Sequence, residues 1–442
     1  MPILIRGGTI LTGNGHGDIL TDGILQIDGS TITSLRSDDR RDVPSDADVV
    51  DARGKIIIPG FVQTHIHLCQ TLFRGLADDL ELLDWLQKKI FPFEATHNAH
   101  SMYASAMLGI TELIRSGTTT ILDMGSVNHE EEVIRAVGES GLRAFVGKAM
   151  MDMNDAYPQL KEPTAVSLKT TRDLAERWHN SYDGRVKYAV APRFVLSCTE
   201  KLLTEASEMI SSFDGMLFHT HASENTNEVT AVRKRCSMEN IEYLHHIHAL
   251  SDRACLAHCI HLNEKEVGIL ASTRTNVAHC PSSNLKLGSG IANIPHLVDA
   301  GITVSLGADG APCNNTLDMF QEMRLASLIQ KPIYGPTAMP AHTVFAMATR
   351  GGATALGIDR VIGTLEIGKK ADLVLLDLQR CWNPASAENL TSSIVYSAGP
   401  ENVDSVMIDG RWVYCKKEFV GIDESKLIAN ARQELQNLLS RV

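Results

Sequence analysis

Two histidines follow a short apolar run near residue 60, in the stretch GFVQTHIHLCQ. His65 and His67 stand two residues apart, so on a strand their side chains project to the same side. The core side of a strand ordinarily carries aliphatic side chains, whereas a metal ion binds imidazole nitrogens. The spacing therefore predicts that this strand ends at a metal site.

Other predicted strands also end in polar residues. These are His221 and Glu224 in GMLFHTHASE, His258 in ACLAHC, His279 in NVAHC and Asp309 in TVSLGADGAP. One histidine at a strand end is more often a hydrogen-bonded structural residue. Several polar residues that converge from separate strand ends indicate a site instead.

Three imidazoles and a carboxylate suit zinc, with iron as the alternative. Such an ion lowers the pKa of a bound water from about 15.7 towards about 7. A second ion would need a ligand from the middle strands, where segment 186–194 offers Lys187 near its start. We therefore expect one divalent metal, with Glu224 relaying protons and His258 polarising the group under attack. The alternatives are a helix N-terminal acid for Glu224 and a supporting hydrogen bond for His258.

The middle of the chain alternates strand-like and helix-like segments. The candidate strands are 59–65, 118–124, 144–151, 186–194, 216–221, 254–258, 276–279 and 303–309. Eight strands alternating with helices are typical of a (β/α)8 TIM barrel, which carries its active site at the carboxyl ends of the strands. A doubly wound open sheet is the alternative, but no G-x-G-x-x-G follows the first strand and there is no P-loop.

Both ends of the chain are rich in short β segments with glycine-containing turns. We predict that residues 1–58 and 365–442 pair into one small β-sandwich domain. Residues 59–364 then form the barrel between its two halves.

The composition limits the protein's partners. Of 442 residues, 41 are Lys or Arg and 53 are Asp or Glu, a formal charge of −12 that argues against nucleic-acid binding. No signal-peptide pattern opens the chain, and no apolar run is long enough for a membrane helix. The nine cysteines are scattered without a C-x-x-C pair, which favours free thiols in the cytoplasm.

Two further clusters invite a functional interpretation. His245, His246 and His248 lie in a polar helical segment, where a solvated face is the better interpretation. Cys255 and Cys259 lie in a buried-looking segment, where apolar packing is the usual role of cysteine.

The stretches PGFVQTHIH, HASE, LAHC, AHCPSSNLKLGSG and GADG together resemble the amidohydrolase superfamily, in its deaminase and chlorohydrolase branch. The resemblance covers nearly the whole chain. It implies that four residues bind the metal, namely His65, His67, His221 and Asp309. It also implies that Glu224 shuttles protons and that His258 assists. We expect His258 and Asp309 to steady the tetrahedral intermediate of the reaction.

The sequence motifs indicate the substrate less clearly than they indicate the metal site. RAFVGKAMMDMNDAYPQLKE and APRFVLSCTEKLL resemble guanine deaminases, which implies a base pocket lined by Gln70, Arg193 and Phe194. A guanidinium and an amide match the carbonyl and ring-nitrogen edge of guanine, and Phe194 can stack on the ring. The alternative for Arg193 is an ion pair at the barrel mouth. GADGAPCNNTLDMFQEMRLASLIQK instead resembles adenosine-type and triazine enzymes, for which Glu94 becomes a candidate.

We expect a metal-dependent deaminase that removes an exocyclic amino group from a purine-type ring and releases ammonia, with guanine favoured. The alternatives are deamination of S-adenosylhomocysteine or 5′-deoxyadenosine, hydrolysis of a triazine, or a non-catalytic binding protein on the same scaffold. Residues 74–94 are long enough to form a lid, in which Trp85 either contacts the substrate or packs. A homodimer is also expected.

Overall fold

The computed structural model describes residues 1–37, 47–379 and 386–442. The predicted composite domain also includes residues 38–46 and 380–385, which lie outside the described residues.

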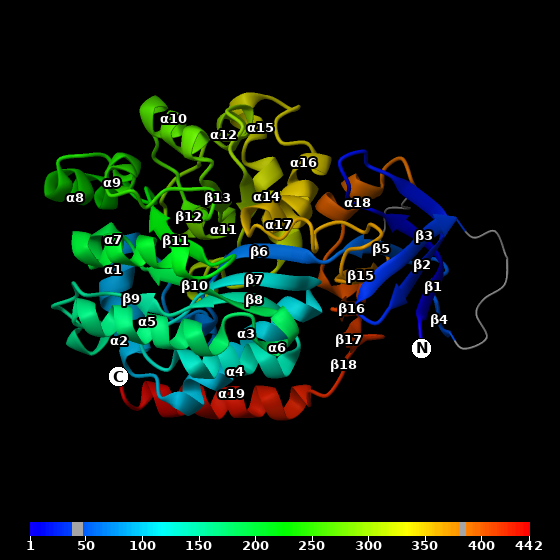
Figure 1. Cartoon of the computed structure of the whole chain (residues 1–442), viewed down its shortest axis with the longest axis horizontal. Helices are drawn as coiled ribbons and strands as arrows, with labels where there is room; N and C mark the ends of the chain where they lie inside the picture. Colours follow the sequence, from blue (N-terminus) through cyan, green and yellow to red (C-terminus); the bar gives the residue numbers. More distant parts are fainter. Residues whose placement is uncertain (38–46, 380–385) are drawn as a thin grey trace.

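Eight parallel strands in the described part of the chain close into a barrel, which confirms the predicted fold (Figure 1). In order around the barrel they are β6 (Phe61–Ile66), β7 (Thr118–Met124), β8 (Arg143–Gly147), β10 (Val186–Pro192), β11 (Leu217–Ala222), β12 (Ala254–His258), β13 (Asn276–His279) and β14 (Val304–Leu306). The short strand β9 (Ala149–Met150) pairs with the end of β10. Pairing of β14 with β6 and of β10 with β11 leaves no open edge in the barrel.

The first barrel strand begins later than the sequence predicted, at Phe61 rather than at residue 59. Ile56–Pro59 forms a separate strand, β5, which belongs to the second sheet. Gly60 joins the two strands where the chain passes close to Thr119, because a Cβ there would lie 2.1 Å from the Thr119 Oγ1 atom. A residue with no side chain therefore lets one continuous segment serve both sheets.

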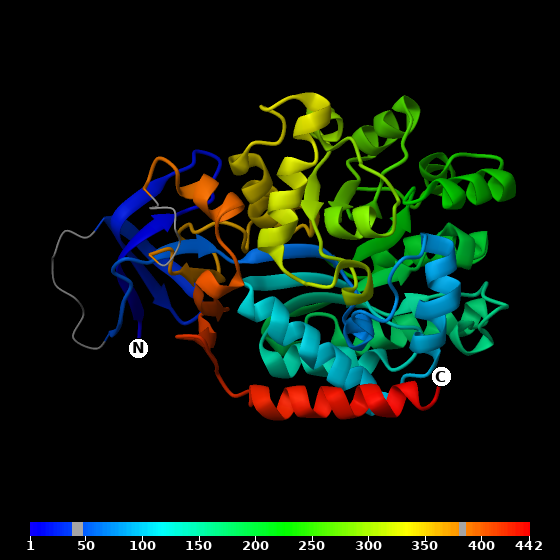
Figure 2. The same ribbon diagram turned by 180° about the vertical axis from the view of Figure 1, so that it is seen from behind.

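Helices follow the strands and cover the outside of the barrel (Figure 2). Those of seven or more residues are α3 (Ala99–Arg115), α4 (Glu130–Ser140), α5 (Thr164–Trp178), α7 (Glu200–Met209), α8 (Thr226–Cys236), α9 (Asn240–His246), α10 (Glu264–Thr273), α14 (Met319–Leu328), α18 (Leu390–Tyr396) and α19 (Glu424–Leu439). The shorter ones are α1 (Leu82–Trp85), α2 (Phe91–Ala95), α6 (Ser181–Gly184), α11 (Pro281–Lys286), α12 (Ile294–Asp299), α13 (Ala311–Asn314), α15 (Lys331–Tyr334), α16 (Ala341–Ala346) and α17 (Gly352–Ala355). The last helix, α19, lies along α3. Within the described residues, no helix combines the length and the apolar character needed to cross a membrane.

The two chain ends build a second, mixed sheet beside the barrel (Figure 1). Its strands run in the order β18 (Glu418–Phe419), β17 (Arg411–Cys415), β16 (Val403–Ile408), β15 (Leu373–Leu376), β5, β1 (Ile3–Leu11), β2 (Ile19–Asp28) and β3 (Thr31–Ser37), with β4 (Asp48–Asp51) paired to β1. Buried aliphatic side chains from both chain ends, such as Ile5, Leu25 and Leu373, form its core. The sheet therefore holds the start and the finish of the chain together.

An apolar layer fills the interior of the barrel. Val62, Leu122, Phe145, Ala189, Leu217, Cys255 and Ala278 contribute to it from seven strands, and Ala353 of α17 and Leu356, which follows it, pack against them. Cys255 thus has the packing role that the sequence suggested. Because this apolar layer fills the interior of the barrel, the polar residues gather at the carboxyl ends of the strands.

Candidate active site

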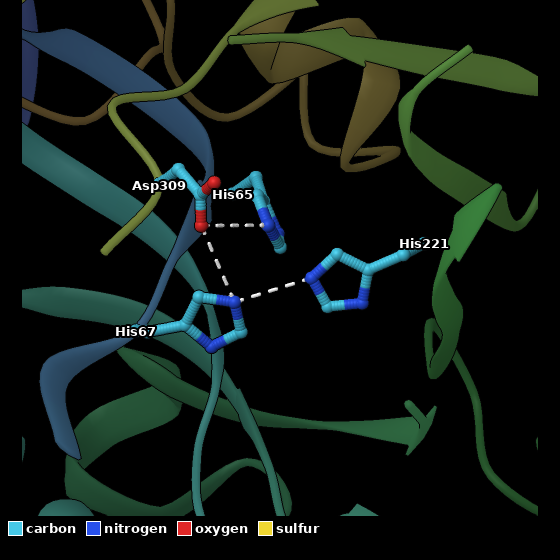
Figure 3. Close-up of side chains that lie close together, drawn as sticks. All are labelled: His65, His67, His221 and Asp309. Atoms are coloured by element: carbon cyan, nitrogen blue, oxygen red, sulfur yellow. Dashed lines mark hydrogen bonds and ion pairs between the residues drawn. The ribbon is translucent and has the colours of Figure 1, made fainter. Parts of the chain in front are cut away.

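Four side chains converge at the carboxyl ends of the barrel strands (Figure 3). His65 and His67 come from β6, His221 from β11 and Asp309 from the turn after β14. One nitrogen or oxygen atom of each lies within 4.8 Å of the corresponding atoms of the others. Asp309 Oδ1 is 3.3 Å from Nε2 of both His65 and His67, and His67 Nε2 is 3.2 Å from His221 Nε2. This is the arrangement expected around a single metal ion.

Backbone carbonyls fix the orientation of two of these imidazoles. His67 Nδ1 lies 2.7 Å from the Met124 carbonyl oxygen, and His221 Nδ1 lies 2.7 Å from that of Arg193. A carbonyl only accepts hydrogen bonds, so in each ring Nδ1 carries the proton and donates it. The Nε2 lone pairs then face the centre of the group, as metal ligation requires.

The third imidazole is oriented by a histidine that the sequence analysis did not single out. His219 Nδ1 lies 2.8 Å from the Cys255 carbonyl oxygen, so this nitrogen is the donor and His219 Nε2 accepts. His65 Nδ1 lies 2.8 Å from that Nε2 and therefore donates to it. The repeated H-x-H spacing of His219 and His221 was the signal that could have revealed this residue.

These imidazoles are neutral, as a metal site needs. Burial lowers the pKa of His67 to about 3 and also lowers the pKa values of His65 and His221. His65 Nε2 is buried and has no hydrogen-bond partner among the described residues. A bound cation would satisfy this lone pair, so the three nitrogens and one carboxylate oxygen fit a zinc or iron ion. Within the described ranges, this is the one group of three or more such side chains placed to hold a metal.

Asp309 is held by an unusual local backbone. Its φ of 63° lies in the left-handed region, which costs energy for a residue other than glycine. Just before it, Gly307 passes so close to β6 that a Cβ would lie 2.7 Å from the His65 carbonyl oxygen. Ser283 Oγ donates to Asp309 Oδ2 at 2.6 Å, and the Gly310 N–H donates to Oδ1 at 2.8 Å. The carboxylate is therefore fixed against the two histidines of β6.

Glu224 and His258 lie beside this group. His258 Nε2 is 3.4 Å from Glu224 Oε2 and 3.9 Å from Asp309 Oδ2, and His258 Nδ1 is 2.8 Å from Asn284 Oδ1. Burial, with the neighbouring Asp309 carboxylate as a second cause, raises the pKa of Glu224 well above its usual range. The Glu224 carboxyl therefore readily holds a proton in this environment, as a proton relay must.

A narrow cavity opens onto these residues. It is lined by His67, Leu82, Trp85, Leu86, Arg193, Phe194, His221, Glu224, His258 and Asp309. Of the residues predicted to bind substrate, Trp85, Arg193, Phe194 and His258 thus line the cavity. Leu82 and Leu86 were missed, because a leucine in an amphipathic segment carries no chemical signal of a site.

Gln70 and Glu94 lie behind the cavity wall instead. Glu94 forms a bidentate ion pair with Arg193, with nitrogen–oxygen distances of 2.8 and 3.2 Å. Gln70 Nε2 donates to Glu94 Oε1 at 2.8 Å. Arg193 thus forms the ion pair that the sequence offered as its alternative role, although it also lines the cavity.

The other candidate histidines belong neither to the metal-binding group nor to the cavity lining. His279 is buried, and neither ring nitrogen has a hydrogen-bond partner among the described residues. His245, His246 and His248 are exposed at the end of α9 and just beyond it, as expected for a solvated helix face.

The segment between residues 74 and 94 forms the outer wall of the cavity. It contains α1, a π-helical turn (Leu86–Ile90) and α2. Lys286 Nζ donates to Asp78 Oδ1 at 2.5 Å, and Tyr157 OH donates to the Gln87 carbonyl at 2.8 Å. Neighbouring loops thus hold this segment over the site.

Two curated relatives match almost the whole chain. The 5′-deoxyadenosine deaminase of Methanothermobacter thermautotrophicus is 42% identical over 413 residues, covering 92% of each chain. The 5-methylthioadenosine/S-adenosylhomocysteine deaminase of Pelotomaculum thermopropionicum is 36% identical over 443 residues, covering 99% of each.

Solved structures agree on the fold. An adenosine deaminase from Xanthomonas campestris with bound zinc superposes with a TM-score of 0.92 at 29% identity, covering 99% of this chain and 98% of that one. Guanine deaminase from E. coli gives a TM-score of 0.84 at 29% identity, covering 93% and 99%. Triazine hydrolase from Arthrobacter aurescens, at 23% identity and a TM-score of 0.90 over 98% of this chain and 99% of that one, shares the fold. The profile of the Amidohydrolase family matches residues 56–413, so the chain belongs to the amidohydrolase family and is a hydrolase that acts on C–N bonds.

Proposed function

We propose that this enzyme is a metal-dependent deaminase of 5′-substituted adenosines. The observation that carries the proposal is the convergence of three neutral imidazoles, Asp309 and the protonatable Glu224 at the inner end of one cavity. The two relatives described above act, by their names, on 5′-deoxyadenosine, 5-methylthioadenosine and S-adenosylhomocysteine. Sequence motifs favoured guanine, but these relatives support the adenosine alternative better.

The reaction exchanges an amino group for oxygen. A water oxygen bonds to C6 of the purine, the bond from C6 to the amino nitrogen breaks, and ammonia leaves. We propose that His65, His67, His221 and Asp309 hold one divalent cation, with zinc favoured because a related deaminase structure contains it. When bound, such an ion supplies the Lewis acidity that makes water a nucleophile at neutral pH.

Glu224 performs the proton transfers in this proposal. Its raised pKa lets it take a proton from the attacking water and deliver it to the departing nitrogen. His258, with Nε2 3.4 Å from the Glu224 carboxyl, faces the carbon under attack. The Asn284 side-chain oxygen accepts a hydrogen bond from Nδ1 and fixes the direction of that ring.

Arg193 and Phe194 are proposed to bind the ring. Arg193 gives two of its five N–H groups to Glu94, which leaves donors for ring nitrogens that only accept. Phe194 lines the cavity beside it and can stack on the ring. Trp85 also lines the cavity, and its indole N–H has no acceptor among the described residues, so we propose that it donates to an oxygen of the ribose.

Guanine deamination is the second candidate. Arg193 and Phe194, the residues that resemble guanine deaminases, line the cavity, and E. coli guanine deaminase shares the fold. Gln70, however, donates to Glu94 and does not line the cavity, so one of the two predicted polar contacts to guanine is missing. The homodimer and the cytoplasmic location expected from the sequence stay predictions.

Ammonia release from metal-replete enzyme tests the proposal, with 5′-deoxyadenosine, guanine and a chlorotriazine as substrates. We expect turnover of 5′-deoxyadenosine, and a preference for guanine or the chlorotriazine would overturn the assignment. Glu224→Gln should lower kcat by about 10²- to 10⁴-fold while the metal content is unchanged. Full turnover by that variant with metal bound would show that Glu224 is not the relay.

A further inference from the structure

We propose that the cavity selects adenosines whose 5′ substituent is uncharged and discriminates against an amino-acid tail. This inference rests on the proposed function and narrows its substrate class. 5′-Deoxyadenosine ends in a methyl group and methylthioadenosine in a thioether, whereas S-adenosylhomocysteine ends in an ammonium and a carboxylate. The names of the relatives include all three compounds, so the choice must come from the walls of this cavity.

The position of the tail follows from the position of the reacting carbon. C6 must lie beside Glu224 and the metal ligands, which form the inner end of the cavity. The ribose is attached to the purine on the side of the ring system remote from C6. Its 5′ group must therefore point toward the lining residues of the segment over the cavity, away from Glu224 and the metal ligands.

Those residues form a neutral wall. Leu82, Trp85 and Leu86 come from the segment over the cavity, and all three are at most 6% exposed. The Trp85 indole N–H is the one polar group of this wall. A methyl or thioether group can pack there without loss of a charge's hydration.

A charged tail would lack a counter-charge. Among the described residues that line the cavity, Arg193 is the single cation, and its side chain is 3% exposed and already paired with Glu94. The acidic lining residues, Glu224 and Asp309, lie at the inner end, away from the tail. Burial of an ammonium and a carboxylate without partners is strongly unfavourable.

The test compares kcat/KM of the metal-replete enzyme for 5′-deoxyadenosine, methylthioadenosine and S-adenosylhomocysteine, measured by ammonia release. We expect the first two to agree within about tenfold and S-adenosylhomocysteine to be slower by about 100-fold, from the cost of a buried charge. Comparable values for all three would overturn this inference and leave the proposed function intact. Deamination of none of them would overturn both.

A charge added to the wall tests the reason for the selectivity. Leu86→Arg should raise the ratio of kcat/KM for S-adenosylhomocysteine to that for methylthioadenosine by about fivefold or more, since the guanidinium can pair with the tail carboxylate. Gln87→Arg adds the same charge one residue further, on an exposed side chain, and should leave the ratio unchanged. An unchanged ratio in a folded, metal-loaded Leu86→Arg enzyme would overturn the assignment of this wall to the tail. If that variant does not fold, the comparison of the three substrates with the unmodified enzyme still decides the matter.

Discussion

Replacement of His219 by phenylalanine should weaken metal binding although His219 is not a ligand. The change keeps a ring of similar size but removes the acceptor 2.8 Å from His65 Nδ1. The His65 ring then has a buried donor without a partner, which costs about 1–3 kcal/mol. The ring can also move its proton to Nε2, the atom that faces the other ligands. Loss of such supporting hydrogen bonds typically weakens metal affinity by about 10- to 100-fold.

A competition titration against a chromogenic chelator measures this effect directly as a zinc dissociation constant. His97→Phe is the matched control, since His97 is also buried and its ring also makes two hydrogen bonds, to Ser101 and to the Cys69 carbonyl. That variant loses stability in a similar way without touching a ligand. Equal zinc dissociation constants for His219→Phe and the unmodified protein would refute the argument that His219 sets the tautomer of His65.

Three further predictions concern charge and hydrogen bonding. Burial raises the pKa of Asp123 from 3.8 to about 7, so between those values the folded state keeps a proton that the unfolded chain has released, and the free energy of unfolding falls as pH rises. By pH 7 this loss approaches about 4 kcal/mol, at 1.36 kcal/mol per pH unit. In urea unfolding, the free energy of unfolding of Asp123→Asn should therefore increase relative to that of the unmodified protein between pH 4 and pH 8. A difference between the two proteins that does not change with pH would contradict this. Glu94→Gln leaves the buried Arg193 charge unpaired and should lower the free energy of unfolding by about 3–5 kcal/mol. A second substitution in the same chain, Arg193→Met, should partly restore it. Equal stability of the Glu94→Gln protein and the unmodified protein would exclude a strong ion pair between Arg193 and Glu94. Trp85→Phe removes the indole N–H from the cavity wall and should raise KM for 5′-deoxyadenosine by about 5- to 10-fold with little change in kcat. Trp178→Phe is the control, because the Trp178 indole N–H also has no partner among the described residues, and it should change neither constant. Equal effects of the two variants would show that the Trp85 N–H does not contact the substrate.

The barrel and the polar residues that converge on it were predictable from the sequence for a general reason. Residues two apart on a strand share a side, and parallel barrel strands deliver their last residues to one mouth. His65, His67, His221 and Asp309 each stand at or just after a strand end, so their convergence needed no knowledge of the register.

The other contacts depend on details that strand periodicity does not contain. The hydrogen bond from His65 to His219 crosses the barrel interior between β6 and β11. The pair of Arg193 with Glu94 joins a strand end to the segment over the cavity, and Gln70 bonds to Glu94 rather than lining the cavity. Substrate preference depends on such packing, which the motifs alone do not contain.

The course of the chain through Gly60 has a consequence for synthesis. β5 continues into β6, the strand that carries His65 and His67, and it pairs Pro59 with Leu373 of β15. β15 leaves the ribosome only in the last part of translation, and pairing two strands as far apart in the sequence as β5 and β15 is slow. The anchor of the metal-binding strand is therefore completed late in translation, after all four proposed metal ligands have been synthesised, so metal capture should accompany this late step of folding.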